Sequence, residues 1–359
     1  MKYISIGLIW LISLSACAQP KSNFKRAIQT SRDSVQALMK RRNIPGLAIT
    51  VMVDGEIAWS EGFGFADLEQ KVKVDPAKTK FRIGSISKSL TAAGLAKLYE
   101  ANKIILDSSI YYYLPNYPRY KYRFTIKQLG GHLAGVRHYK GNEWYSTQHY
   151  SSVTEGLSMF KDDSLNFKPG LKYQYTSHGF NLLSAVMEKA ARQNFLVFMQ
   201  KEVFEPLKLV NTKPDVNDSI IDSRTRFYQI EHSRVKNAPY VDNSYKWAGG
   251  GFISTSNDIA TFGNALLGNT FLKPETIKLF TTPQKLNDGS FTTYGIGFAS
   301  GKDSKQNSWF GHSGGSVGGT TDMVIYPEKK IVVVVLTNLS DARLGAISRQ
   351  VAQMFVGSK

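Results

Sequence analysis

The chain has 359 residues, a length that allows one large domain or two lobes around sizeable cores. Hydrophobic residues make up 42% and charged residues 20%, which excludes a disordered chain, and the single cysteine excludes a disulfide framework or a thiolate-rich metal cluster. Lys and Arg number 45 against 28 Asp and Glu, but these basic residues are scattered, so we expect a charged surface and no nucleic-acid partner.

The N-terminus has the pattern of a secretory signal. Met1–Lys2 precedes an apolar run, Ile4–Leu14, that is too short for a permanent membrane span. The run ends at Leu14-Ser15-Ala16-Cys17, which resembles the lipobox of bacterial lipoproteins, where the cysteine is lipidated. We therefore expect a signal peptide over residues 1–16, a tether with a lipidated Cys17 over 17–23, and a folded domain over 24–359. These features predict an extracytoplasmic lipoprotein anchored by its lipid to a bacterial membrane, either periplasmic or in the outer membrane. The alternative is a plain signal peptide with an incidental cysteine.

The elements predicted along the chain place strands at both ends and helices between them. Helical spacing covers Phe24–Arg42, and Asp54-Gly55 is a hairpin turn between two predicted strands. The predicted strands are Leu47–Val53, Glu56–Ser60, Thr320–Tyr326 and Ile331–Leu336, and an amphipathic helix ends the chain. The order predicts an α/β (α+β) fold, with an antiparallel sheet formed from both termini, flanking helices, and a mostly helical insert over about 85–267. A site is expected in the cleft between sheet and insert.

A serine and a lysine lie one helical turn apart at the first border of the insert. Ser85–Glu100 has a helical pattern, so the side chains of Ser85 and Lys88 can meet on one face. A buried lysine can lose its proton and then act as the base that activates a serine nucleophile. Such a tetrapeptide is common by chance, and the alternative is an N-cap serine with a surface lysine.

A second polar segment precedes the predicted helix Asn181–Ala191. Tyr175 and Ser177 flank Thr176, so an extended segment would turn both side chains toward one cleft. Tyr175 is a candidate base or proton relay beside Lys88, and Ser177 a candidate substrate contact. The alternative for Tyr175 is a core aromatic residue.

A third segment is rich in glycine and lies near the C-terminus. Here His312, Ser313, Gly314 and Gly315 are candidate substrate-binding residues, because glycines let a ligand approach a strand closely. His312 is expected to orient substrate or to tune the charge of the cleft near neutral pH. The backbone N–H groups of Ser85 and Gly315 are the candidates for an oxyanion hole.

These segments in this order resemble the three motifs of the class C-like serine β-lactamases and penicillin-recognising hydrolases. The resemblance covers about 24–356 and is closer to the mitochondrial serine β-lactamase-like proteins of animals, on the segments Gly131–Tyr139, Thr225–Tyr228 and Pro239–Gly251. It implies a β-lactamase/transpeptidase-like fold and an acyl-serine mechanism, in which Ser85 attacks while Lys88 and Tyr175 move protons. It also implies a small-molecule or peptide substrate, no cofactor, and, from the animal relatives, possible self-association.

Two departures from the family pattern bear on the substrate. Ser177 stands where an asparagine is usual, and His312 replaces the lysine of true β-lactamases, which removes a charge for a substrate carboxylate. Lys246 or Arg226 are candidates to supply that charge instead. The predicted function is therefore a peptidase, amidase or esterase, and the alternatives are a non-catalytic scaffold or filament-forming protein and a true β-lactamase.

The remaining polar clusters are expected to be structural. His132 and His138 lack a carboxylate at metal-ligand spacing and are interpreted as loop histidines, and no metal site is expected. Asp162-Asp163 is interpreted as a solvated turn.

Overall fold

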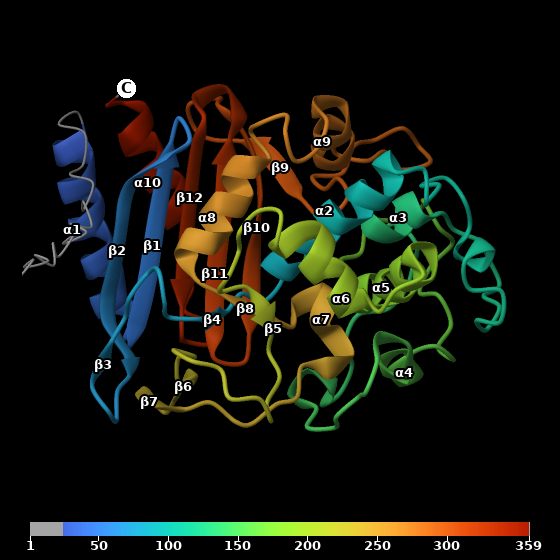
Figure 1. Ribbon diagram of the computed structural model, residues 1–359, viewed down its shortest axis with the longest axis horizontal. Coiled ribbons are helices and arrows are strands. Elements are labelled where there is room, and N and C mark those ends of the chain that lie inside the picture. Colours follow the sequence, from blue (N-terminus) through green and yellow to red (C-terminus); the bar gives the residue numbers. More distant parts are fainter. Residues whose placement is uncertain (1–23, 359) are drawn as a thin grey trace, which may run out of the picture.

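A seven-stranded antiparallel sheet drawn from both ends of the chain is the centre of the computed structural model, which describes residues 24–358 (Figure 1). The strand order is β3-β2-β1-β12-β11-β10-β9. Its strands are β1 (Gly46–Val53), β2 (Glu56–Asp67), β3 (Val72–Lys73), β9 (Ala299–Lys302), β10 (Ser308–Ser316), β11 (Gly319–Tyr326) and β12 (Ile331–Thr337). The predicted sheet from both termini is therefore confirmed. Cys17, the predicted signal peptide and the tether lie outside the described residues.

Two fully buried strands, β1 and β12, pair at the middle of the sheet and join its N-terminal and C-terminal parts. Leu47 lies opposite Thr337 and Val53 opposite Ile331, and every residue of both strands is buried. Their runs of β-branched and other apolar side chains fit a position covered on both faces. The flanking helices α1 (Lys25–Arg42) and α10 (Ile347–Val356) share an apolar cluster with one face, and α8 (Ser256–Ala265) and α2 (Ile86–Glu100) lie on the other.

The helical insert lies beside the sheet, on the right in Figure 1. Its remaining helices are α3 (Ile126–Gly130), α4 (Val153–Gly156), α5 (Ser177–Ala191), α6 (Phe195–Met199) and α7 (Trp247–Gly250), and α9 (Pro274–Thr281) follows it. Short strands β4 (Phe81–Arg82), β8 (Phe252–Ser254) and β5 (Lys213–Pro214) form a second sheet, and β6 (Tyr228–Glu231) and β7 (Arg234–Asn237) form a hairpin. Among residues 24–358, no helix has both the length and the hydropathy to cross a bilayer.

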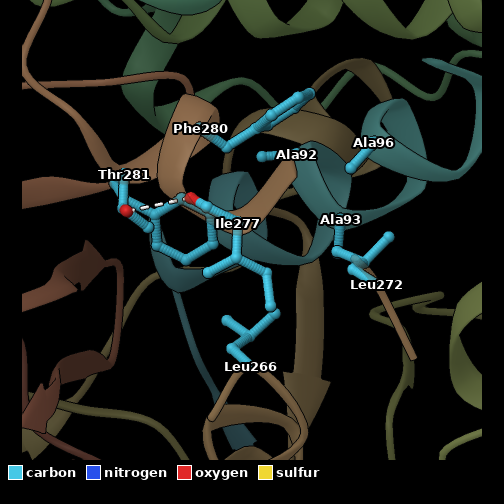
Figure 2. A pocket seen from close by; sticks show the side chains of 9 residues that line it. Ala92, Ala93, Ala96, Leu266, Leu272, Ile277, Phe280 and Thr281 are labelled. Carbon is cyan, nitrogen blue, oxygen red and sulfur yellow. Dashed lines mark hydrogen bonds between the residues drawn. The ribbon is translucent and has the colours of Figure 1, made fainter. Parts of the chain in front are cut away.

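Helix α2 is buried along nearly its whole length, which fixes the residues at its N-terminus. Figure 2 shows its alanines facing the larger apolar side chains of α9 and the preceding loop. The residues in contact around this small apolar cavity include Ala92, Ala93, Ala96, Leu266, Ile277 and Phe280. Small side chains on α2 let these neighbours pack closely, and close packing limits movement of the helix.

Helix α5 begins earlier than its periodicity indicates. Its first residue is Ser177, and the Thr176 hydroxyl caps it by accepting the Gly179 N–H at 3.2 Å. The prediction of an extended segment that carries both Tyr175 and Ser177 is therefore wrong, because a threonine N-cap starts the helix between them.

Candidate active site

Ser85 and Lys88 meet at the N-terminus of α2, as their spacing predicts. Ser85 is the N-cap residue and is partly exposed, whereas Lys88 lies wholly inside the protein. The Lys88 Nζ lies 3.1 Å from the Ser85 Oγ and 3.0 Å from the Ser177 Oγ, and it donates to the Gly249 carbonyl oxygen at 2.5 Å. A lysine on α2 therefore links the serine to the N-terminus of α5 and to α7.

No carboxylate pairs with the Lys88 ammonium among residues 24–358. Burial, with a smaller contribution from the charge on Lys246, holds the pKa of Lys88 well below the ordinary value for lysine. Loss of a proton leaves an amine lone pair, and the Ser85 O–H can then donate to it. The contact is therefore suited to proton transfer from the serine to the lysine.

The Tyr175 ring forms one wall beside these two residues. Lys88 Nζ lies 4.8 Å from the centre of the ring. Burial raises the pKa of Tyr175 far above that of a free phenol, and the neighbouring Ser85 hydroxyl offsets part of this rise. A phenol in this setting stays protonated at neutral pH, so it is better suited to donating a proton than to removing one.

Two histidines support the backbone between Tyr175 and α5. The Thr176 N–H donates to His132 Nδ1 at 3.2 Å, and the Ser177 N–H donates to His138 Nδ1 at 3.1 Å. Burial lowers the pKa of His138 to about 4 and that of His132 well below its usual value. Both rings are therefore neutral at pH 7 and accept these hydrogen bonds. The structure thus adds to the interpretation as loop histidines that both rings hold the backbone of the second motif.

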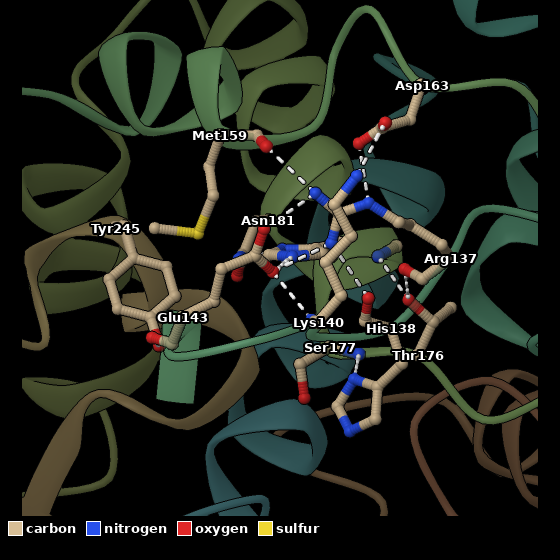
Figure 3. Close-up of polar contacts among 12 residues, drawn as sticks. Arg137, His138, Lys140, Glu143, Met159, Asp163, Thr176, Ser177, Asn181 and Tyr245 are labelled. Carbon is tan, nitrogen blue, oxygen red and sulfur yellow. Dashed lines mark hydrogen bonds and ion pairs between the residues drawn. The ribbon is translucent and has the colours of Figure 1, made fainter. Parts of the chain in front are cut away.

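An ion-pair network holds the segment that carries His138, as Figure 3 shows. Arg137 makes two 2.7 Å hydrogen bonds with Glu143 and one of 2.5 Å with Asp163. The Arg137 carbonyl accepts the Thr176 hydroxyl, and Glu143 also contacts His178 Nε2 at 3.0 Å. Asp162-Asp163 lies in a turn, as interpreted, and the fold adds an arginine partner for the partly exposed carboxylate of Asp163.

The third segment is brought to the nucleophile by close backbone contact. Gly84 has a φ of +51°, and a Cβ there would lie 2.6 Å from the Gly315 carbonyl oxygen. A Cβ on Gly314 would lie 2.1 Å from the Ile83 carbonyl oxygen, so both positions exclude a side chain. The N–H of Ser85 donates to no group among the described residues, which leaves it available as an oxyanion donor together with that of Gly315.

His312 is held in a single neutral form. Its Nδ1 lies 2.5 Å from the Ser313 carbonyl oxygen, so this nitrogen carries the proton. Its Nε2 accepts the Tyr294 hydroxyl at 2.7 Å, and burial lowers the pKa of His312 to about 3. The prediction that His312 tunes charge near neutral pH is therefore wrong, because the burial of this ring prevents its protonation there.

The other predicted contacts divide between buried and exposed positions. Ser177 is buried and contacts Lys88, while Ser313 and Gly315 are exposed on the same strand. The Arg226 guanidinium forms ion pairs with the carboxylates of Asp67 and Glu69, at 3.5 and 3.6 Å, so its charge is already paired.

Lys246 is another buried lysine near the site, and motif spacing does not single it out as part of the catalytic group. Its Nζ lies 4.7 Å from the Trp144 ring centre, 5.1 Å from that of Tyr245 and 5.7 Å from that of Tyr139. Burial lowers its pKa to about 7, and the nearby Arg82 charge adds to this, while Asp215 and Asp242 oppose it. Its charge acts on Lys88 through space. No cluster of three His, Cys, Asp or Glu side chains among the described residues could hold a metal ion.

Comparisons with known proteins agree with this fold. The family model described as Beta-lactamase matches residues 32–353. The human protein named serine beta-lactamase-like protein LACTB, mitochondrial, is 31% identical, over 92% of this chain and 80% of that protein. An octameric penicillin-binding protein homologue from Pyrococcus abyssi has a TM-score of 0.79 at 24% identity, over 92% of this chain and 77% of that one. EstCE1, described as a hydrolase with promiscuous acyltransferase activity, has a TM-score of 0.76 at 19% identity, over 93% of this chain and 100% of that one.

The comparisons contradict the predicted location. The human relative and its mouse and bovine counterparts, each 31% identical, are named as mitochondrial proteins, not as bacterial periplasmic or outer-membrane lipoproteins. A short apolar run ending in small residues is a weak signal, because it contains little information beyond its length and hydropathy.

Proposed function

The chain belongs to the beta-lactamase family, and from that premise we propose that it is a serine hydrolase that cleaves an amide or ester bond through an acyl-Ser85 intermediate. The observation that carries the proposal is the 3.1 Å contact between the Ser85 hydroxyl and a fully buried Lys88. A surface lysine would remain charged and could not accept the serine proton, whereas burial favours the neutral amine.

In the acylation step, the Ser85 Oγ attacks the carbonyl carbon of the substrate while its proton moves to Lys88 Nζ. Donation of Lys88 to the Ser177 hydroxyl and the Gly249 carbonyl keeps the amine aimed at Ser85. The negative charge that develops on the carbonyl oxygen is stabilised by the N–H groups of Ser85 and Gly315.

The tetrahedral intermediate then collapses, and the bond to the leaving group breaks. The leaving amine or alkoxide needs a proton, and the neutral phenol of Tyr175 is next to Ser85 and supplies it. Tyr175 recovers its proton from the Lys88 ammonium, which lies over its ring. Water then attacks the acyl-Ser85 ester by the same groups acting in reverse. Lys88 is thus the base and Tyr175 the acid of this proposal.

The substrate proposed is a peptide-like amide or an ester, in preference to a β-lactam. The neutral, buried His312 gives the third segment no positive charge for a β-lactam carboxylate. The hydroxyl of Ser177, which replaces the usual asparagine, accepts a hydrogen bond from Lys88 and lacks the separate donor and acceptor of an asparagine amide. A resemblance of fold to hydrolases does not by itself name the substrate.

The proposal is tested by labelling the full chain with a fluorophosphonate probe and by assaying p-nitrophenyl esters, D- and L-aminoacyl peptides and nitrocefin. We expect labelling and turnover that Ser85→Ala abolishes and that Ser158→Ala, a change at an exposed serine, leaves intact. Labelling that survives Ser85→Ala would overturn the assignment of the nucleophile. Absence of both labelling and turnover, together with large assemblies by light scattering, would favour the non-catalytic scaffold instead.

A further inference from the structure

A cavity of about 390 Å³ lies beside the third segment, next to the proposed catalytic group but not lined by Ser85, Lys88 or Tyr175. Its floor is formed by β10 and β11, where Ser313 lies directly opposite Asp322 in the register of the two strands. Its opposite wall comes from Arg349 on α10. The volume falls within the roughly 300–1,000 Å³ that small-molecule sites occupy.

Asp322 is a lining carboxylate that forms no ion pair with the described residues. Its Oδ2 is enclosed and accepts no hydrogen bond from them. The neighbouring Ser348 hydroxyl and the Arg349 charge each lower its pKa and so offset part of the effect of burial. Burial raises the pKa of Asp322 to about 6, so the carboxylate is ionised at neutral pH at an energetic cost.

Arg349 is a lining guanidinium that is also unpaired among the described residues. It lies 5.3 Å from the centre of the Trp309 ring and forms no ion pair with Asp322, although both line the same cavity. Trp309 lines the cavity too, and its indole N–H is buried without an acceptor. The two opposite charges line one cavity and interact through space, but they form no direct ion pair. Enclosed charges are normally paired directly, so this arrangement leaves room for a ligand between them.

We propose that this cavity is a binding site for an α-amino acid in its zwitterionic form. The ammonium group of the ligand pairs with Asp322 and its carboxylate pairs with Arg349, while the apolar side chain packs along the Trp309 ring. A ligand with only one charge would satisfy one of the two protein groups and be repelled by the other, since a guanidinium disfavours a nearby ammonium. The zwitterion is therefore the class of ligand that fits both.

Ser85, Lys88 and Tyr175 do not line this cavity, and binding to it does not depend on the hydrolase activity. The proposed oxyanion donor Gly315 does line it, so an amino acid bound there lies next to the cleft. Binding is therefore measured directly and not through turnover.

The test is calorimetric titration of the full chain with L-leucine, D-leucine, isopentylamine and isocaproate at neutral pH. Isopentylamine is leucine without its carboxylate, and isocaproate is leucine without its ammonium group. We expect at least one leucine enantiomer to bind saturably, and each single-charge analogue to bind about tenfold more weakly or worse, the loss of one charge-assisted hydrogen bond. No saturable binding of either enantiomer up to its solubility limit would overturn the proposal.

Variants separate this site from the catalytic one. Asp322→Asn and Arg349→Gln should each weaken leucine binding about tenfold or more, whereas Arg343→Gln, at an exposed arginine that pairs with Asp341, should not. Ser85→Ala should bind leucine as the natural chain does, whether or not that chain hydrolyses anything. Leucine binding that survives both Asp322→Asn and Arg349→Gln, in folded protein by circular dichroism, would place the ligand elsewhere and overturn the assignment.

Discussion

Lys88 and Asp322 are two ionisable side chains that form no ion pair with the described residues. Burial lowers the pKa of Lys88 and raises that of Asp322, so each is pushed toward its neutral form. Enclosing such groups costs free energy, and side chains with strongly shifted pKa values are found mostly at functional sites. Each of the two makes a prediction at the scale of a single residue.

Lys88→Met should lower the rate of Ser85 acylation by about 10²–10⁴-fold, because a methionine cannot accept the serine proton. Lys88→Arg should not restore it, since a guanidinium stays protonated. In the natural chain, the labelling rate should rise with pH through a pKa well below that of ordinary lysine and then level off. The measurement is the rate of fluorophosphonate labelling across pH. A rate that is still climbing near pH 10, the range of an ordinary lysine, would contradict Lys88 as the base.

Asp322→Asn should stabilise the fold at neutral pH. Because the folded-state pKa is raised from 3.8 to about 6, stability falls as pH rises through that window, and the cost persists above it. Removal of the charge should increase the free energy of unfolding by on the order of 1–3 kcal/mol at pH 7 and by almost nothing at about pH 3.5. Urea denaturation at the two pH values gives the difference. An equal effect at both would show that the charge is not its cause.

At the scale of elements, the loop before α2 is held between two strands that are far apart in sequence. Arg82 of β4 donates to Asp215 at 2.7 Å and to the Val317 carbonyl oxygen at 2.8 Å, so it ties the nucleophile loop to the turn after β10. Asp215 also accepts from Asn243 at 2.7 Å, and Arg224 lies 3.4 Å away. The position of Ser85 against Gly315 therefore depends on a buried ion pair.

Arg82→Met should destabilise the fold by about 3–5 kcal/mol, because it leaves the Asp215 carboxylate buried with weaker partners. The double variant Arg82→Met with Asp215→Leu should recover part of this loss, since no uncompensated charge remains. Chemical denaturation of the single and double variants measures both effects. A double variant as unstable as the sum of the single ones would show that the two side chains act independently.

At the scale of the whole molecule, the buried histidines in and around the site are neutral in the folded state. Burial lowers the pKa of these four histidines: His132, His138, His178 and His312. Below the unfolded-state pKa of 6.5 the unfolded chain gains protons that the folded chain does not. The folded state thus loses stability as the pH falls from 6.5 toward 4 and lower.

The free energy of unfolding should therefore decrease below pH 6.5, by up to about 1.4 kcal/mol per pH unit for each of the four histidines. The raised pKa values of Asp322 and Asp258 oppose part of this decrease. Denaturation between pH 7 and 4.5 measures the slope, and His232→Gln, at an exposed histidine, is the control that should leave it unchanged. A flat profile over this range would contradict the burial of neutral imidazoles.

The sequence alone was sufficient for the strands at both termini, the helix that follows Ser85, and the order of the three segments. Each of these depends on local periodicity, turn residues or spacing within one helical turn. It failed at the start of α5, which a threonine N-cap places earlier than the apolar pattern indicates. It also failed at His312, because a sequence motif does not show whether a histidine is protonated.

Only the tertiary structure decided which groups meet and which of them keep their charge. His132 supports Thr176, Arg349 faces the same cavity as Asp322, and the charge on Lys246 acts on Lys88, each across a long separation in the chain. Protonation depends on how much water a side chain loses when distant segments pack around it. That loss is a property of the packed molecule, and it cannot be predicted from the type of a residue or from its spacing in the sequence.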